Sequence, residues 1–188
     1  MKQRYQLIYA DPAWKYGCWY QSEDVKRNAA DHYDVMETKD MKLIPVNEIS
    51  DKDSVLLMWV TYPCLKDAFD LMEVWGYEYK TVAFTWVKRN KKGIGWFLGL
   101  GNYTRANAEI CLLGTKGKGL PRMSHSVRQI LDDRIRKHSQ KPDATYARIE
   151  ELFGEVSKVE LFARERREGW DSWGNQLPKD TQQIFRSA

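Results

Sequence analysis

The segment from Ser54 to Val60 is, after its serine, a continuous apolar run of strand length. A strand without a polar face must be covered on both sides, which is the position of a central strand in a layered domain. Other strand-like runs alternate with segments whose apolar residues recur at helical spacing. The predicted strands cover 7–10, 79–87, 108–114 and 158–163, and the predicted helices cover 65–75 and 142–153. This alternation predicts an α/β three-layer sandwich with a mostly parallel sheet.

The chain of 188 residues has the usual length of one domain. Because no repeat, linker or low-complexity block divides it, we expect one domain over residues 1–177 and a tail over 178–188. Two polar segments interrupt the pattern, at 15–52, with a short helix expected near 36–44, and at 88–105. Loops of this length in a compact domain are usually functional or mobile. A weaker strand signal covers 127–133.

The composition argues against several classes of protein. Three cysteines and three histidines are scattered without a metal-binding spacing, so no metal site is expected, and free thiols in a reducing cytoplasm fit best. No apolar run approaches the ~20 residues of a membrane span, and no signal-peptide core follows the start. A formal charge of +4, together with eight tryptophans and ten tyrosines, is compatible with a nucleic-acid partner.

The first apolar run ends abruptly in the order Asp11, Pro12, Ala13, Trp14. Such an ending brings a carboxylate, a stiffened turn and a stacking surface to one edge of the sheet. These groups suit methyl transfer to an exocyclic aromatic amine: Asp11 and a main-chain carbonyl accept the amine hydrogens, while Trp14 stacks on the base. The neutral amine is the nucleophile and needs no prior deprotonation. Taken alone, however, four residues favour a simple strand-ending turn beside a buried aromatic.

Basic and aromatic side chains in the two polar segments are candidates for nucleic-acid contacts. A run of cations directly precedes an aromatic, glycine-rich stretch, and tyrosines are interspersed in the first segment. A merely solvated charged face is the alternative. The candidates are Tyr16, Tyr33, Lys88, Arg89, Lys91, Lys92 and Arg105.

Eight short blocks occur in a fixed order along nearly the whole chain. They are Ala10–Trp14, Leu57–Thr61, Trp75–Tyr77, Thr85–Lys88, Asn107–Glu109, Lys141–Asp143, Glu160–Arg164 and Trp173–Leu177. No single block is decisive, but together they resemble the MT-A70 family of S-adenosylmethionine-dependent N6-adenine methyltransferases. That family includes eukaryotic messenger-RNA adenosine methyltransferases and many DNA adenine methyltransferases of bacteria and phages.

The resemblance implies a Rossmann-like methyltransferase fold in permuted order, with the catalytic strand first and the cofactor strand last. It also implies S-adenosylmethionine as the cofactor. On the family pattern, Asp11, Pro12 and Trp14 bind the target adenine, and Glu109 faces the site. The implied cofactor-binding residues are Asp11 near the methionine end, Lys141 near the cofactor carboxylate, Glu160, Phe162 and Arg164 at the end of the cofactor strand, and Asn175 and Gln176 beside the ribose and adenosine.

Each of these residues also has a simpler explanation outside the ordered set. Lys141 fits the start of a helix, Glu160 with Arg164 fits a surface ion pair, and Asn175 fits a turn. Two positions depart from the family pattern. The usual Asp-Pro-Pro-Trp motif has Ala13 as its third residue, which removes one ring from the turn, and Ala163 stands where some relatives have glycine.

Only six residues precede the apolar run that begins at Leu7. Larger relatives use upstream sequence to bind the cofactor adenine, so the segment from Trp173 to Leu177 is expected to complete that pocket here.

The expected activity is methyl transfer to the N6 amine of adenine in DNA, with the base flipped out of a duplex or met single-stranded. RNA adenosine and the cytosine amine are alternative acceptors for the same chemistry. A non-catalytic nucleic-acid-binding subunit is a rival of a different class. A dinucleotide enzyme is disfavoured because no complete Gly-x-Gly-x-x-Gly opens a helix. We expect a cytoplasmic monomer or homodimer.

Overall fold

The computed structural model describes residues 3–14, 36–101, 103–136, 140–178 and 184–185. Tyr16 and Tyr33, both predicted to contact nucleic acid, lie outside the described residues, as does most of the predicted tail. The strands are β1 (Tyr5–Ala10), β2 (Ser50–Val60), β3 (Glu78–Arg89), β4 (Ala108–Lys116), β5 (Ile130–Arg134), β6 (Lys158–Leu161) and β7 (Asp171–Trp173). The helices are α1 (Thr38–Met41), α2 (Val46–Ile49), α3 (Leu65–Val74) and α4 (Ala144–Phe153), with a 3₁₀ turn at Tyr62–Cys64.

The strands form one seven-stranded sheet in the order β5-β3-β4-β2-β1-β6-β7. All neighbouring pairs are parallel except the two that β4 makes, so β4 alone among these strands runs in the opposite direction. The predicted α/β class with a mostly parallel sheet is therefore confirmed, and the fold is Rossmann-like. The reversal of β4 was not predicted, because its apolar run looks the same in either direction.

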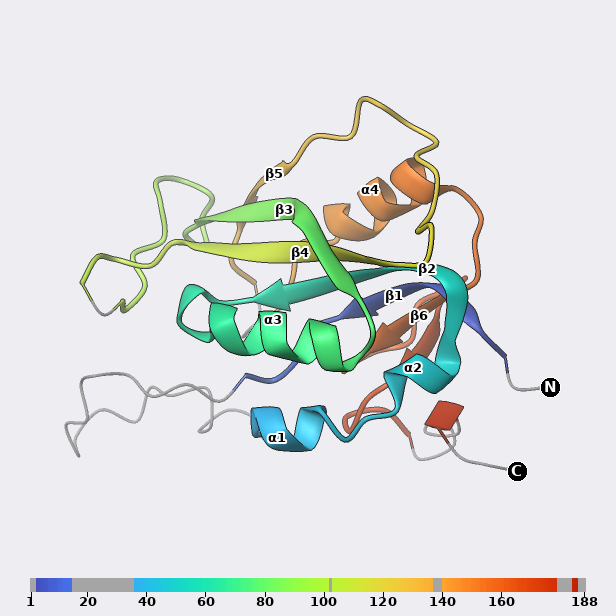
Figure 1. Ribbon diagram of the computed structural model, residues 1–188. Coiled ribbons are helices and arrows are strands. Elements are labelled where there is room, and N and C mark those ends of the chain that lie inside the picture. The colour runs from blue at the N-terminus through green and yellow to red at the C-terminus, as the bar shows by residue number, and fades with distance from the viewer. Residues whose placement is uncertain (1–2, 15–35, 102, 137–139, 179–183, 186–188) are drawn as a thin grey trace.

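Helices cover both faces of the sheet, with α3 on one side and α4 on the other (Figure 1). Successive residues of a strand point to opposite faces, so β1 divides its side chains between two cores. Ile8 and Ala10 pack in the cluster that contains α1, α2 and α3, whereas Leu7 and Tyr9 pack in the cluster that contains α4. β2 is divided in the same way. Two-sided burial explains why the run at Ser54–Val60 has no polar face, as predicted.

The carboxyl ends of β1, β2, β3 and β6 finish at one edge of the sheet. Because β4 runs the other way, its first residues lie at that same edge. The chain leaves β1 on the side of α1 and α2, but enters β6 from α4 on the opposite side. A change of side between neighbouring strands is a switch point, where open α/β sheets bind ligands.

Most predicted elements are present, with shifted ends. The helices predicted at 36–44, 65–75 and 142–153 correspond to α1, α3 and α4, and the weak signal at 127–133 corresponds to β5. The structure corrects three points: α2 and β7 were not predicted, β2 begins earlier, and β3 extends into the expected loop at 88–105. Within the described ranges, no helix is long and apolar enough to cross a membrane.

Candidate active site

Five neighbouring strands place one large polar or aromatic side chain each at the carboxyl edge. Alternate residues of a strand share a face, and Tyr9, Trp86 and Cys111 belong to the core on the α4 side. Asp11, Lys88 and Glu109 each lie two positions from one of these three residues, and they therefore point to the same side as α4. The row comprises Lys88 on β3, Glu109 on β4, Trp59 on β2, Asp11 after β1 and Glu160 on β6.

Four charges alternate along this row once Lys141 is included. Lys141 precedes α4, and its Nζ lies 2.7 Å from Asp11 Oδ1 and 3.3 Å from Glu109 Oε2. The other carboxylate oxygen of Glu109, Oε1, accepts a hydrogen bond of 2.5 Å from Lys88 Nζ. The Lys141 ammonium also lies 5.7 Å from the centre of the Trp59 ring, which adds a cation–π contact. We call Lys88, Glu109, Lys141 and Asp11 the charge ladder.

Glu109 is buried and the other three members of the ladder are largely buried, so their charges depend on one another. The side chain of Lys141 is only 8% exposed; burial opposes its charge, but Asp11 and Glu109 outweigh burial and raise its pKa. Burial also acts against ionised Glu109, yet Lys141 and Lys88 lower its pKa to about 2. Burial raises the pKa of Asp11, with Lys141 opposing and Glu109 adding to the rise. Glu109 is thus firmly ionised, and Asp11 is the better proton acceptor.

Hydrogen bonds fix the turn after β1 although Ala13 replaces the second proline of the family motif. The Trp14 amide donates to the Pro12 carbonyl at 2.9 Å, and the Met36 amide donates to the Ala13 carbonyl at 3.1 Å. A carbonyl oxygen has two lone pairs, and within the described part of the chain each of these two uses one, which leaves one for a ligand. The Asp11 carboxylate and two carbonyl acceptors therefore belong to one short turn.

Trp14 is buried at the end of this turn. Its indole N–H donates to the Trp59 carbonyl at 2.9 Å, and its ring belongs to the core on the α3 side. Trp59 in turn donates to the Tyr9 hydroxyl at 2.6 Å. In the described structure Trp14 anchors the turn to β2, and its stacking on a target base stays a prediction.

Glu160 lies beside Asp11 on the neighbouring strand β6. Its carboxylate is buried and accepts a hydrogen bond of 2.9 Å from the Tyr146 hydroxyl. Burial, with smaller effects from the charges of Asp11 and Glu165, raises the pKa of Glu160 to about 7, although Tyr146 and Arg167 act against the rise. The site therefore holds a carboxyl group that changes protonation near neutral pH.

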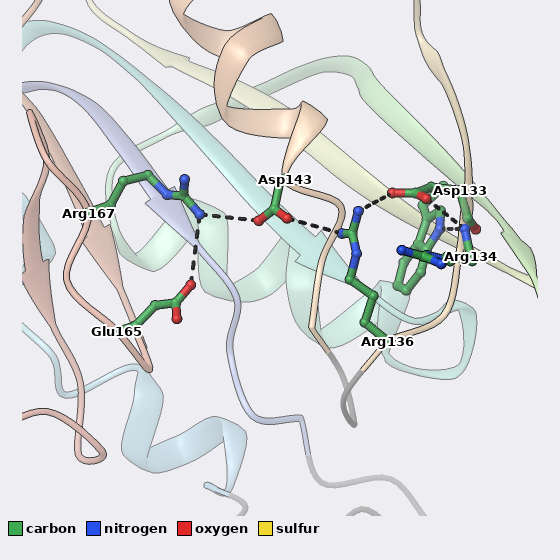
Figure 2. A network of polar contacts seen from close by, with 7 residues as sticks. Asp133, Arg134, Arg136, Asp143, Glu165 and Arg167 are labelled. Atoms are coloured by element: carbon green, nitrogen blue, oxygen red, sulfur yellow. Dashed lines mark hydrogen bonds and ion pairs between the residues drawn. The ribbon is translucent and has the colours of Figure 1, made fainter. Parts of the chain in front are cut away.

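A chain of ion pairs secures the segment that carries Lys141 (Figure 2). Asp143 at the start of α4 lies 3.3 Å from the guanidinium of Arg167 and 3.6 Å from that of Arg136. Arg136 also pairs with Asp133 at 2.9 Å, and Arg167 lies 3.7 Å from the centre of the Tyr146 ring. The network joins the end of β5, the start of α4 and the segment after β6, and so restrains Lys141 from both sides.

The segment after β6 packs directly on the segment after β7. Phe162 has a φ of +63°, a strained conformation for a bulky residue, and its ring contacts those of Trp75 and Trp173. A Cβ at Gly174 would lie 2.1 Å from the Ala163 carbonyl oxygen, so only glycine fits there. This close approach places Asn175 and Gln176, both exposed, next to the end of β6.

The structure brings some predicted residues together and separates others. Asp11, Lys141 and Glu109 are in contact, Glu160 is beside them, and the charge of Arg164 acts on Asp11. Lys91, Lys92 and Arg105 are exposed in the connection from β3 to β4. These roles stay predictions.

Several residues have contacts that were not predicted. Arg89 forms two hydrogen bonds of 2.7 Å to Asp132 and lies over the Trp96 ring, while Lys88 turns inward to Glu109. Lys88 lies two positions after Trp86 along β3 and so faces the same side of the sheet. This spacing was the sequence signal for its inward position. Lys141 was predicted at the cofactor carboxylate, and in the structure it pairs with two carboxylates of the protein itself, those of Asp11 and Glu109. Among the described residues, no three His, Cys, Asp or Glu side chains cluster as metal ligands.

Comparison with known proteins identifies relatives along nearly the whole chain. The sequence is 36% identical to the type II methyltransferase M.MunI of a Mycoplasma species, over 97% of this chain and 82% of that protein. It is 29% identical to an N(6)-adenosine-methyltransferase MT-A70-like protein of Arabidopsis thaliana, and 27% identical to the human N(6)-adenosine-methyltransferase catalytic subunit METTL3. These two matches cover 91% and 93% of this chain, but only 23% and 28% of the plant and human proteins. The sequence model named MT-A70 matches residues 5–176, and the chain therefore belongs to the MT-A70 family of methyltransferases.

Proposed function

We propose that this protein transfers a methyl group from S-adenosylmethionine to the N6 amine of adenine in DNA. The observation that carries the proposal is the Asp11 carboxylate, which Lys141 holds at 2.7 Å and which belongs to the same turn as the Pro12 and Ala13 carbonyls, at the switch point of the sheet. An exocyclic amine has two hydrogens, and this turn offers one charged and one neutral acceptor for them.

Asp11 aligns the amine and later takes its proton. With both amine hydrogens bound, the nitrogen lone pair is directed away from the turn, toward the position of the methyl donor. When bound, S-adenosylmethionine supplies an electrophilic methyl group. The nitrogen becomes cationic and strongly acidic once methylated, and the Asp11 carboxylate accepts the released proton. Burial favours this last step, because it raises the pKa of Asp11.

The residues around Asp11 suit the chemistry of the proposed cofactor. Arg164 supplies a positive charge for a carboxylate, and Glu160 supplies an acceptor for hydroxyl or ammonium groups. Asn175 and Gln176 are exposed amides on a segment that Gly174 holds against the end of β6. Phe162, strained at the end of β6, supplies an aromatic ring. These are the side chains that would hold S-adenosylmethionine, with its methyl group toward Asp11.

DNA is the favoured acceptor because of the degree of similarity to each kind of relative. The type II methyltransferase M.MunI is 36% identical to this chain, whereas the plant and human adenosine methyltransferases are 29% and 27% identical to it. RNA adenosine is the second candidate, since those N(6)-adenosine methyltransferases share the catalytic segment.

The test is transfer of tritiated methyl from S-adenosylmethionine to unmethylated DNA and to RNA, followed by nucleoside mass spectrometry of the product. We expect N6-methyladenine in DNA, with a rate at least 100-fold lower for Asp11→Ala. Asp11→Asn, which keeps one acceptor oxygen but no charge, should lose at least tenfold. The matched control is Asp70→Asn, on the exposed face of α3. Absence of transfer by the wild type, or equal activity of Asp11→Ala, contradicts the proposal.

A further inference from the structure

The connection from β3 to β4 forms an exposed apolar arm, which we define as residues 90–106 and which the structure describes at 90–101 and 103–106. Large apolar residues occur at every second position, Ile94, Trp96, Leu98 and Leu100. Ile94, Leu98 and Leu100 are 77%, 70% and 59% exposed. Water-exposed side chains of this size are unusual when they gather in one segment, and such gatherings mark interaction sites.

Main-chain hydrogen bonds give the arm a defined shape. The Phe97 amide donates to the Lys88 carbonyl at 2.9 Å, and the Gly99 amide donates to the Ala106 carbonyl at 2.9 Å. A Cβ at Gly99 would lie 2.4 Å from the Ala106 oxygen, so the two sides of the arm approach as closely as glycine allows. The result is a narrow ribbon with its apolar side chains on the outside.

The charge of the arm and its base selects the kind of partner. From Lys88 to Asn107, both included, the sequence has five lysine or arginine residues and no aspartate or glutamate. Lys91, Lys92 and Arg105 are exposed. A surface that combines cations with outward apolar side chains matches a polyanion with a stacked apolar interior, which is the composition of double-stranded DNA.

The arm begins at the active edge. Its base is Lys88, the first member of the charge ladder, which is linked to Asp11 through Glu109 and Lys141. Figure 1 shows the arm projecting beyond the sheet on the side where β1 also ends. A duplex held on the arm therefore lies next to the turn that is proposed to receive the target adenine.

We propose that the arm is a wedge for double-stranded DNA, in which Leu98 and Leu100 enter the base stack and hold open the space that the target adenine leaves. The inference rests on the proposed function, because a methyl acceptor inside a duplex must leave the stack to reach Asp11. Lys91, Lys92 and Arg105 bind the flanking phosphates. Apolar wedges that open a base step are an established way for proteins to distort duplex DNA.

A binding assay separates the wedge from the methyl transfer. Fluorescence anisotropy is measured on a 30-base-pair duplex and on the same duplex with one abasic site, where the stack is already open. Wild type should bind the abasic duplex at least fivefold more tightly, and the variant Leu98→Ala/Leu100→Ala should lose this preference. The matched control is Leu43→Ala/Met123→Ala, which removes two exposed apolar side chains elsewhere. Lys91→Gln/Lys92→Gln should weaken binding to both duplexes alike. It should also reduce the slope of the logarithm of the binding constant against the logarithm of the salt concentration by about 2 in magnitude.

A transfer assay completes the test once sequencing has located the methylated adenines. Leu98→Ala/Leu100→Ala should lower the rate at least tenfold when the target adenine is paired, and less than threefold when it lies opposite an abasic site. Equal losses on both substrates, no loss on either, or retention of the binding preference overturns the wedge. Loss of a homodimer in Leu98→Ala/Leu100→Ala, seen by sedimentation equilibrium, also overturns it. Failure of wild type to methylate any DNA overturns the proposed function, while the anisotropy assay still reports on the wedge.

Discussion

Asp11 and Glu109 share one ammonium group, that of Lys141, which lies 2.7 Å from the first carboxylate and 3.3 Å from the second. The two acids come from strands that are separated in the sheet by β2. The shared cation spans that strand above the Trp59 ring. Glu109 therefore acts on the proposed acceptor residue without touching it, by holding Lys141 in place.

Removal of the Glu109 charge should weaken both folding and catalysis. Glu109→Gln leaves Lys141 and Lys88 with one carboxylate fewer in a buried setting. We expect this change to lower the free energy of unfolding by roughly 2 kcal/mol at pH 7. Urea denaturation measures this change. A double-mutant cycle with Lys141→Gln should give a coupling of at least about 1 kcal/mol, and additive effects would show that the ladder is not one unit.

The pKa of Glu160 makes stability depend on pH in a defined direction. Because burial raises this pKa to about 7, the folded state binds the proton more tightly than the unfolded chain does. The contribution is fully present below the ordinary carboxyl pKa and is lost as the pH rises through 7, with a total of roughly 3 kcal/mol.

Glu160→Gln, which stays neutral and can still accept the Tyr146 hydrogen bond, should remove this dependence. Thermal unfolding at pH 5 and pH 8 should show wild type losing stability relative to Glu160→Gln as the pH rises. Glu73→Gln, at an exposed position of α3, is the control and should track wild type. A constant difference between wild type and Glu160→Gln at the two pH values would contradict the assignment.

Restoring the second proline of the motif should be tolerated. Among the described residues, the hydrogen bonds of the turn use the amides of Asp11, Trp14 and Met36 and the carbonyls of Pro12 and Ala13, but not the Ala13 amide. Ala13→Pro should therefore keep kcat within threefold and stabilise the fold by up to about 1 kcal/mol through a less flexible unfolded chain. A tenfold fall in kcat would show that the turn needs the freedom of alanine.

The contact of Gly174 with Ala163 should separate folding from cofactor binding. Gly174→Ala forces a Cβ against the Ala163 carbonyl, and we expect a loss of roughly 1–3 kcal/mol by urea denaturation together with weaker S-adenosylmethionine binding by calorimetry. Asn175→Ala removes only an exposed amide. It should leave the unfolding midpoint unchanged and weaken cofactor binding at least threefold. Unchanged binding in Asn175→Ala would remove this residue from the proposed cofactor site.

Much of the fold was predictable because the apolar runs have the length and pattern of their elements. The run at Ser54–Val60 has no polar face, which predicts burial on both sides of the strand. Pro142 lies just before α4 and Gly154 just after it, which predicts where this helix begins and ends. β7 was missed because Asp171–Trp173 is three residues long and not apolar, so its position depends on pairing with β6. The direction of β4 depends on the hairpin it forms with β3, a property of tertiary structure that leaves no mark on its composition.

The candidate site was predicted in part for the same reason. Asp11 stands in a motif next to its strand, and the ordered set of blocks along the chain, rather than the motif alone, pointed to its role. Lys88 was assigned to nucleic acid because it opens a basic run, and only the pairing of β3 with β4 shows that it reaches Glu109. Arg136, Asp143 and Arg167 come from three separate segments and meet only in the folded chain. No local sequence pattern predicts such a network.

Because β4 runs in the opposite direction to β3, the arm is a hairpin loop whose sequence can vary separately from the rest of the fold. β3 and β4 form a hairpin, and the Lys88–Glu109 ion pair closes it just below the point where the arm begins. We expect that length or sequence can change beyond that pair without moving the ladder or Asp11. On the proposed role of the arm, exchange of residues 90–106 between related enzymes should change substrate preference and leave the methyl-transfer chemistry in place.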